Sequence, residues 1–352
     1  MKPDSPPTAA EPKVAIIILN WNGFDDSVEC LRSLRDITYR NHTVVLVDNG
    51  SGNSEGTRLK ELFPEIHLIS NKTNRGFAGG NNDGMNWALQ NGFDYIVNLN
   101  NDCLVDNKWL TQLLSGLKTY GADFASSRIM YYPETELICS DGDVLLPDGS
   151  GIVMNLFKKF DPPGETKTIF SACGAGSIYS ARCLEAVKLS GNQFFDELFF
   201  AYLEDVDLGA RVIAKKFMGI SIPDAVVYHK ESRSAGARSY LQIFNLEKNR
   251  ILMELLNFPV YYLPLSEFFY FLRTLVRNVG RIIKKPAGTA ARPLEKNRPN
   301  PFHVLFTSRM WILSHLPEIL ANRKERRQKG LIDPAIFKNL CWDLSKIFFS
   351  RG

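Results

Sequence analysis

The chain has 352 residues, of which 45% are hydrophobic and 23% charged, so its composition excludes a fibrous or wholly disordered protein. This length predicts one large domain with a substantial addition. The net charge is +4, and the six cysteines include no CxxC pair and no zinc-type cluster with histidine. A reducing, cytoplasmic environment fits this cysteine pattern.

The predicted elements begin after a short tail. Residues 1–12 contain four prolines and no apolar run, which predicts a disordered tail and not a signal peptide. Residues 14–19 (VAIIIL) are typical of a strand buried on both faces of a parallel sheet. Apolar residues at helical spacing follow over 25–37.

The same alternation of strand and helix then repeats. The further predicted strands are 43–47, 66–69 and 95–99, and the further predicted helices are 54–63, 81–90 and 108–120. Such an order predicts right-handed βαβ units and a doubly wound, mostly parallel sheet.

The second half of the chain is less regular. Residues 131–167 are rich in Gly, Pro and Asp and predict loops or short strands, whereas 171–180 predict a Gly-rich turn leading into a strand, and 205–217 predict an amphipathic helix. After residue 250 long apolar stretches alternate with basic clusters. We therefore predict three parts, a tail (1–12), an α/β domain (13–250) and a helical, basic C-terminal region (251–352).

Polar residues follow directly after the first, second and fourth predicted strands. A further polar, Gly-rich segment comes after the turn that ends the third predicted strand. These segments are NWNG (20–23), DNGS (48–51), NRGFAGGNN (74–82) and NND (100–102). Each alone is explained by a turn, but four at one rim predict a binding site, because ligands of open α/β sheets bind beyond the carboxyl ends of the strands. No GxGxxG follows the first strand and no GxxxxGK[ST] occurs, which disfavours a dehydrogenase or a P-loop enzyme.

This set of motifs resembles the family 2 glycosyltransferases of GT-A fold, specifically their rhamnosyltransferase-like branch. The matching segments are LNWNG (19–23), VDNGS (47–51), NRGFAGGNN (74–82), LNND (99–102), GAGSIYS (174–180) and FFAYLEDVDLGAR (199–211). They extend over more than half of the chain in the expected order. The resemblance implies an α/β GT-A domain with a Rossmann-like, mostly parallel sheet, here followed by a helical C-terminal appendage.

The resemblance also implies a nucleotide-sugar site. Asp48 would accept hydrogen bonds from the ribose or the pyrimidine ring, with Asn20 and Asn49 framing the base. The loop 75–80 would offer backbone N–H groups and the Arg75 cation to the pyrophosphate or the donor sugar. The complete expected set is Asn20, Asn22, Asp48, Asn49, Ser51, Asn74, Arg75, Gly76, Phe77, Gly79, Gly80 and Asn100.

A metal site is implied where the family carries its DxD-type motif. Residues 100–102 read Asn-Asn-Asp, so Asp102 is the expected ligand for Mg²⁺ or Mn²⁺, and Asn100 removes one negative charge. The metal affinity without nucleotide is therefore expected to be low. His229 lies where many GT-A enzymes supply a further ligand, although a structural histidine is the alternative.

The proton acceptor is expected among Glu204, Asp205 and Asp207. Inverting transfer needs one carboxylate that deprotonates the acceptor hydroxyl, and the family motif points to Asp205 with Glu204 beside it. Asp207 has a structural explanation at a helix N-terminus, with Arg211 at i,i+4 spacing. Gly174, Ala175 and Gly176 are expected on the acceptor side.

The C-terminal region predicts an interfacial segment. The apolar stretch 255–272 contains prolines, Asn257 and Glu267, which argue against a membrane span. Eight Lys or Arg residues lie within 273–298 and a second basic run at 323–327, a pattern suited to anionic lipid headgroups. Packing of these helices on the core is the alternative, and no motif indicates nucleic-acid binding.

Together these features predict an inverting, metal-dependent hexosyltransferase at the cytoplasmic, inner face of the plasma membrane. Transfer of rhamnose from dTDP-rhamnose to a lipid-linked or polysaccharide acceptor of the cell envelope follows from the branch resemblance alone. The alternative is a non-catalytic module that binds nucleotide sugar or glycan, which the Asn100 departure would explain.

Overall fold

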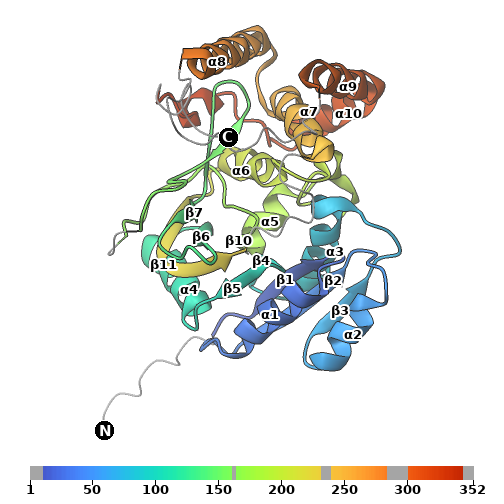
Figure 1. Cartoon of the computed structure of the whole chain (residues 1–352), viewed down its shortest axis with the longest axis vertical. Coiled ribbons are helices and arrows are strands. Elements are labelled where there is room, and N and C mark those ends of the chain that lie inside the picture. Colours follow the sequence, from blue (N-terminus) through green and yellow to red (C-terminus); the bar gives the residue numbers. More distant parts are fainter. Residues whose placement is uncertain (1–10, 161–163, 231–238, 284–299, 344–352) are drawn as a thin grey trace.

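A nine-stranded mixed sheet organises the first two thirds of the chain (Figure 1). The computed structural model describes residues 11–160, 164–230, 239–283 and 300–343, so the predicted tail lies largely outside the described residues. The strand order is β3-β2-β1-β4-β10-β6-β11-β5, with β7 paired to β6. The strands are β1 (Val14–Asn20), β2 (His42–Asp48), β3 (His67–Ser70), β4 (Tyr95–Asn100), β5 (Cys103–Val105), β6 (Phe124–Tyr131), β7 (Ile138–Ser140), β10 (Gly176–Ser180) and β11 (Gly219–His229).

The first four strands are parallel, as the apolar runs predict, and the later ones make the sheet mixed. β10 is antiparallel to both β4 and β6, and β5 is antiparallel to β11. Because β1, β2 and β4 share one direction, their carboxyl ends meet at one edge of the sheet. The irregular segment between β7 and β10 contains a separate hairpin of β8 (Asp143–Leu145) and β9 (Gly151–Val153).

Helices cover both faces of the sheet. α1 (Phe24–Arg35), α2 (Glu55–Leu62) and α4 (Trp109–Tyr120) contribute to one apolar cluster, together with Ile16 and Ile18 of β1. α3 (Gly76–Gln90), α5 (Ala181–Val187) and α6 (Glu204–Ala214) contribute to the other, together with Ala15 and Ile17. Alternate residues of one strand therefore supply both cores, which is why β1 is apolar throughout.

Helix α3 begins at Gly76, five residues before the predicted start at 81. Its glycines allow it to lie very close to the sheet, since a Cβ on Gly80 would stand 2.3 Å from Leu19 and one on Gly84 would stand 2.4 Å from Ile17. The prediction placed the start too late because small residues without a helical apolar pattern were interpreted as a loop. The segment NRGFAGGNN is thus mostly the first two turns of a helix.

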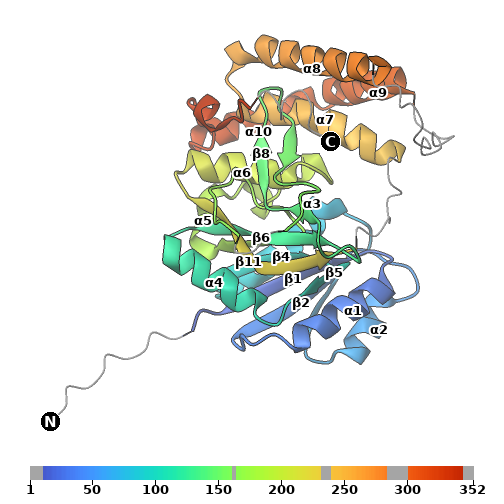
Figure 2. The same cartoon turned by 60° about the vertical axis from the view of Figure 1, so that its left-hand side comes forward.

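The C-terminal helices stack over one end of the α/β part (Figure 2). They are α7 (Tyr240–Asn257), α8 (Leu263–Ile283), α9 (Pro301–Ser314) and α10 (Leu316–Gln328), with the short turns η3 (Val260–Tyr262) and η4 (Ile336–Asn339). Figures 1 and 2 place α8 and α9 on the side of α7 that faces away from the sheet. Among the described residues, no helix combines the length and apolarity of a membrane span.

A buried ionic network joins these helices to the α/β part. Arg326 of α10 forms ion pairs with Asp196, before η2 (Glu197–Phe199), and with Asp207 of α6. Asp207 also pairs with Arg211 at 3.0 Å and accepts a hydrogen bond from Asn257 of α7. Because α7 crosses residue 250 without a break and these groups are buried, the structure shows no gap at the predicted boundary.

Candidate active site

Asn20 ties together the carboxyl ends of β1, β2 and β4. Its Nδ2 donates to Ser51 Oγ at 3.1 Å and to Glu55 at 3.0 Å, and its Oδ1 accepts from Ser27 at 2.8 Å. Asn101, which follows β4, also donates to Ser27 at 3.0 Å. Asn20 is completely buried, so in this structure it shapes the rim from beneath.

Asp48 and Ser51 order the loop between β2 and α2. Asp48 accepts the N–H of Ser51 at 3.2 Å and that of Gly56 at 3.1 Å, so each carboxylate oxygen receives a backbone donor. Ser51 Oγ accepts the N–H of Asn22 at 3.0 Å, and Asn22 Oδ1 accepts the N–H of Gly52 at 2.9 Å. The expected nucleoside-binding residues of the two strand ends therefore form one connected surface.

Asn49 holds the turn that leads into α3. Its Nδ2 donates to Asn74 Oδ1 and to Gly76 O, both at 3.0 Å, and its Oδ1 accepts the N–H of Arg75 at 3.1 Å and Nδ2 of Asn71 at 3.1 Å. Both donors and both acceptor directions of this buried amide are thus used by the protein. Its interactions here position the loop, and none is directed to a ligand.

The beginning of α3 is already well supplied with hydrogen-bond partners. The N–H of Gly76 donates to Asn74 Oδ1 at 2.8 Å, and that of Ala78 donates to Phe200 O at 3.1 Å. Arg75 forms ion pairs with Asp83 and, at 2.9 Å, with Glu197. These contacts leave this helix N-terminus less open to a pyrophosphate than its sequence suggests.

Asp102 and His229 come together although they are far apart in sequence. Strand β5 pairs with the end of β11, and Asp102 Oδ1 lies 3.1 Å from His229 Nε2. Cys103 Sγ completes a potential ligand cluster. Burial, with the Asp102 charge, raises the pKa of the Cys103 thiol well above its ordinary value, so a hard cation would find the carboxylate and the imidazole as its ligands.

Asp205 lies at the start of α6 against the Gly-rich turn before β10. Its Oδ2 accepts the N–H of Gly174 at 3.1 Å, and its Oδ1 accepts the N–H of Val206 at 2.8 Å. A Cβ on Gly174 would stand 2.9 Å from the ring of Phe77, on α3. The turn, the aromatic ring and the half-buried carboxylate thus meet at one point.

The same turn links this carboxylate to the Asp102–His229 pair. Ala175 O accepts the N–H of Asn100 at 3.3 Å and the thiol of Cys103 at 3.6 Å, while the neighbouring Gly174 bonds Asp205. Residues 174 and 175 therefore connect Asp205 to the chain on either side of Asp102. Asn100 is half-buried at the end of β4, and its side chain forms no hydrogen bond within the described part of the chain.

Burial strongly perturbs the acids around Asp205. Burial raises the pKa of Asp205, against the opposing effect of the N–H groups of Gly174 and Val206. Burial and the Asp205 charge raise the pKa of Glu204 well above its usual value, and its Oε2 is buried without a hydrogen-bond partner among the described residues. Asp207 differs, since Arg326 and Arg211 outweigh burial and hold its pKa below the usual range.

Asp143 is a further buried acid near Asp205, and it is not among the residues predicted from sequence. Burial and the nearby Asp205 charge raise its pKa well above the ordinary value, and it accepts a hydrogen bond from Ser171 at 3.4 Å. It belongs to β8, in the irregular segment that predicted only loops or short strands. The repeated acids of Asp141-Gly142-Asp143 were the available signal.

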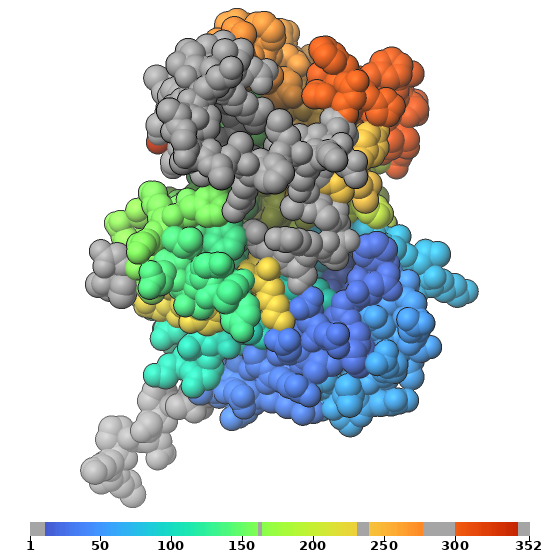
Figure 3. Space-filling model, viewed as in Figure 1, coloured from blue at the N-terminus to red at the C-terminus, as the bar shows by residue number. Residues whose placement is uncertain are grey.

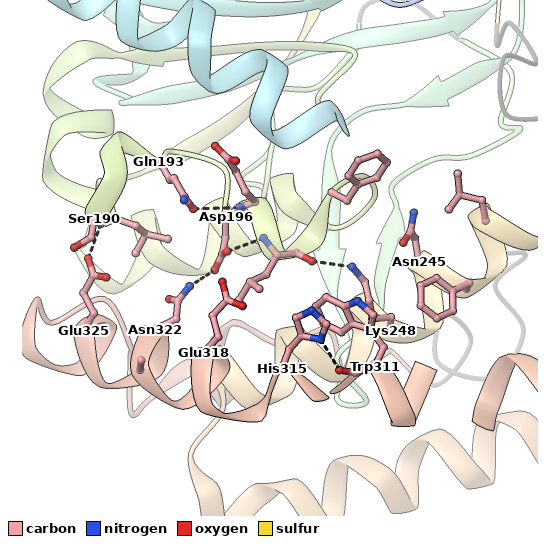
Figure 4. Close-up of a pocket in the computed structure, with 17 residues that line it drawn as sticks. Ser190, Gln193, Asp196, Asn245, Lys248, Trp311, His315, Glu318, Asn322 and Glu325 are labelled. Carbon is pink, nitrogen blue, oxygen red and sulfur yellow. Dashed lines mark hydrogen bonds between the residues drawn. The ribbon is translucent and has the colours of Figure 1, made fainter. Parts of the chain in front are cut away.

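A cavity of about 750 Å³ lies next to this site, between the segment 189–200 and the helices α7, α9 and α10 (Figure 4). Phe200 and Glu197 line it and also contact the start of α3, through Gly76 and Arg75 respectively. Its wall further includes Lys248 and Trp311, whose ring centroid lies 4.3 Å from Lys248 Nζ. The cavity therefore borders the segment that precedes Asp205.

Comparisons with known proteins agree with this geometry. Residues 15–187 match the family model "Glycosyl transferase family 2". A "Glycosyltransferase GlyA" of Streptococcus pneumoniae serotype 4 is 24% identical over 184 residues, which cover 50% of this chain and 25% of that protein. The match thus spans about a quarter of that relative's length.

An N-acetylglucosaminyl-diphospho-decaprenol L-rhamnosyltransferase of Mycobacterium tuberculosis is 24% identical over 226 residues, which cover 58% of this chain and 72% of that protein. The solved structure of GalNAc-T7 with UDP, GalNAc and Mn²⁺ aligns with a TM-score of 0.59 and 11% identity, over 96% of this chain and 58% of that one. This likeness confirms the predicted GT-A fold.

Proposed function

We propose, from the premise that this chain belongs to glycosyl transferase family 2 through residues 15–187, that it transfers a hexosyl group from a nucleotide diphosphate sugar to an acceptor hydroxyl with inversion. The observation that supports this most is the meeting of Asp205, Gly174 and Phe77 beside the strand-end surface. Asp205 would accept the proton of the acceptor hydroxyl as its oxygen attacks the anomeric carbon and the nucleotide diphosphate departs from the opposite face. Its raised pKa suits a group that must gain a proton during the reaction.

The donor would lie across the carboxyl ends of β1, β2 and β4. Of the Asn20, Asn22, Asp48 and Ser51 surface, the exposed Asn22, the half-buried Ser51 and the 8% exposed Asp48 are proposed to receive the nucleoside, while the buried Asn20 supports them and Asn49 holds the turn. The residues of α3 are proposed to contact the donor sugar. Since the N–H groups of Gly76 and Ala78 are satisfied within the protein, we propose that binding of the pyrophosphate depends mainly on other groups.

Asp102 and His229 fit a divalent cation. Asp102 Oδ1 and His229 Nε2 lie 3.1 Å apart, so a carboxylate oxygen and an imidazole nitrogen would be the ligands that hold the ion. A bound Mg²⁺ or Mn²⁺ would neutralise charge on the leaving diphosphate. The GalNAc-T7 structure, which was solved with UDP, GalNAc and Mn²⁺, supports this proposal by analogy of fold.

The donor sugar and the acceptor are proposed from the Mycobacterium relative, whose name specifies L-rhamnosyl transfer to N-acetylglucosaminyl-diphospho-decaprenol, a lipid-linked sugar. Rhamnose from dTDP-rhamnose and a lipid-linked or polysaccharide acceptor of the cell envelope are accordingly the first substrates to test. A lipid-linked acceptor would require the protein to work at a membrane surface, which we propose to be the inner face of the plasma membrane.

The proposed membrane surface is formed by the outer sides of α8 and α9, which lie at the orange end of the molecule in Figure 3. Its exposed apolar side chains are Leu265, Phe268, Phe271 and Leu275 on α8 and Phe302, Phe306, Met310 and Leu313 on α9. Spacings of three and four residues place each set along one helix face. Such an arrangement suits insertion into the headgroup region.

The basic residues contribute less than the sequence suggests. Arg273 is buried and pairs with Asp148 at 2.8 Å. In the second basic run Arg326 is buried, and the half-buried Arg323 donates to Phe258 O at 2.8 Å, so both side chains are engaged within the protein. The side chains of residues 277–283 and the whole of 284–299 lie outside the described residues.

The direct test is a panel of nucleotide diphosphate sugars incubated with the protein, Mn²⁺ or Mg²⁺ and a polyprenyl-diphosphate-linked acceptor, with release of free nucleotide as the readout. We expect release that needs a divalent cation and stops in EDTA, with dTDP-rhamnose as the best donor. Binding of a nucleotide sugar without turnover of any donor would instead support the non-catalytic module, in agreement with the missing acid at Asn100.

A further inference from the structure

The backbone immediately before Glu204 and Asp205 has an unusual conformation. Phe200, Tyr202 and Leu203 have φ angles of 62°, 74° and 66°, in the left-handed region that non-glycine residues rarely adopt. This short segment connects η2 to α6. A conformation of this kind persists only where surrounding groups determine it.

Two adjacent side chains of α7, Lys248 and Asn249, donate hydrogen bonds to the carbonyl groups of this segment. Lys248 Nζ donates to Leu198 O at 2.7 Å and to Phe199 O at 3.3 Å. Asn249 Nδ2 lies 3.0 Å from Phe199 O, 2.8 Å from Ala201 O and 2.6 Å from Tyr202 O, so its two N–H groups are shared among three carbonyl acceptors. Figure 4 shows the Lys248 contact at the wall of the cavity.

The geometry of the Asn249 contacts determines the orientation of its amide. All three partners are carbonyl oxygens, which accept only, so Nδ2 must face them. Asn249 is completely buried and Lys248 is 2% exposed, so both side chains are shielded from bulk solvent. Phe199 O also accepts the N–H of Ala201 at 2.7 Å, whereas Ala201 O and Tyr202 O accept from Asn249.

The segment 198–203, which Lys248 and Asn249 bind, contacts both α3 and the start of α6. Its Phe200 carbonyl accepts the N–H of Ala78 at the start of α3, and a Cβ on Gly76 would stand 2.4 Å from that oxygen. Its other end continues directly into Glu204 and Asp205. A shift of this backbone would therefore move α3 relative to the proton acceptor.

We propose that Lys248 and Asn249 are positioning residues for the transfer reaction, which fix the carbonyls of residues 198–202 and thereby place Asp205 against Gly174 and the donor. This inference rests on the proposed function, because Asp205 is the proton acceptor in both. It assigns to a C-terminal helix a part in catalysis that lies outside the 15–187 match.

The first test needs no substrate. Asn249→Ala is compared with Asn245→Ala, a matched control one turn earlier on α7, where the buried Asn245 Nδ2 makes no hydrogen bond among the described residues. Hydrogen exchange followed by mass spectrometry should show faster exchange over 198–206 in Asn249→Ala and unchanged exchange there in the control. Equal exchange of this peptide in both variants would overturn the proposal.

The second test separates positioning from binding. With the donor found in the nucleotide-sugar panel, Asn249→Ala and Lys248→Met should lower kcat by about 10- to 100-fold and leave the donor KM within about twofold, since small misplacements cost this much. Lys248→Arg, which keeps the charge and the donors, should recover most of kcat. Should Asn249→Ala fail to fold, Lys248→Met alone decides, and unchanged kcat in the folded variant refutes the proposal.

Failure of the two proposals can be told apart. If Asp205→Asn is inactive while Asn249→Ala and Lys248→Met turn over like Asn245→Ala, the positioning role is wrong and the proposed function stands. If Asp205→Asn keeps near-normal turnover, the proposed proton acceptor is wrong and the positioning argument fails with it.

Discussion

Asp205 is half-buried, and burial raises its pKa even though two backbone N–H groups stabilise the carboxylate. A proton acceptor works only when deprotonated, so kcat/KM should fall as the pH is lowered through the pKa of this group in the free enzyme. We expect the acid limb of the pH profile above about 4, the ordinary aspartate value. The measured pKa will belong to the cluster of Asp205, Glu204 and Asp143. A rate that is independent of pH down to about 4 would contradict this assignment.

Gly76 offers a second test at the scale of one residue. Its φ is +72°, and a Cβ would stand 2.4 Å from the Phe200 carbonyl, whereas Gly92 has a φ of +69° and nothing within 4 Å. Alanine at either position should lower the free energy of unfolding by about 1–2 kcal/mol, because its Cβ disfavours the left-handed backbone conformation. Gly76→Ala should cost about 1–3 kcal/mol more for the clash and reduce turnover.

The matched variant Gly92→Ala carries only the conformational cost. Urea unfolding of both variants gives the difference directly. If the two lose the same free energy of unfolding, then α3 and the 200–203 segment can separate more easily than the structure indicates.

Among the elements, α6 carries both a proposed catalytic group and a structural one. Asp207 is completely buried between Arg211 and Arg326, so Asp207→Asn removes the carboxylate that pairs with Arg211 and leaves Arg326 paired with Asp196 alone. Removing one partner of a buried ion pair costs about 3–5 kcal/mol, and we expect a loss of this size in the free energy of unfolding. Glu65→Gln at the half-exposed Arg35–Glu65 pair is the control, with an expected loss of at most about 1 kcal/mol.

The pH dependence of stability gives an independent check of the same network. Arg326 and Arg211 hold the pKa of Asp207 below its unfolded value, so its stabilising contribution is present above the unfolded pKa and lost as the pH falls through the folded pKa. Asp207→Asn should therefore reduce the loss of stability on the acid side. An unchanged slope of unfolding free energy against pH would show that Asp207 titrates normally.

The regular elements were largely predictable from sequence. Strands β1 to β4 were found because each is an apolar run, and the Asp205–Gly174 contact joins two motifs that the resemblance had placed on the acceptor side. Asp143 could not be placed, because its short hairpin has no periodicity and becomes buried only through tertiary packing. Arg211 was the predictable partner of Asp207, at i,i+4 spacing, whereas its other partners, Asn257 and Arg326, and the carbonyls bound by Asn249 lie about 50 or more residues away, where local patterns carry no information.

For the molecule as a whole, the outer faces of α8 and α9 should determine membrane binding. Phe268 and Phe271 are 56% and 63% exposed, and their replacement by serine should weaken binding to vesicles containing phosphatidylglycerol without loss of fold. Leu62→Ser with Tyr120→Ser, each 53% exposed on α2 and α4, is the control and should bind like the unmodified protein. Vesicle co-sedimentation across a salt series measures both.

Point variants are preferable to removal of residues 251–352. That deletion would cut α7 in its middle and remove Arg326, which would leave Asp196 and Asp207 with less buried countercharge. Loss of vesicle binding by the truncated chain could then reflect unfolding. If the serine variants and the intact protein bind vesicles equally well, the exposed aromatic face serves another purpose.

The most direct test of the whole account is sugar transfer by Asp205→Asn. The substitution keeps the size of the side chain but removes its ability to accept a proton, and a positioned base contributes about 10²–10⁴-fold. We predict that turnover falls at least about a hundredfold, while binding of the nucleotide diphosphate, measured by calorimetry with Mn²⁺, stays within about threefold of the original. Near-normal turnover by the folded Asp205→Asn protein would contradict the proposed mechanism.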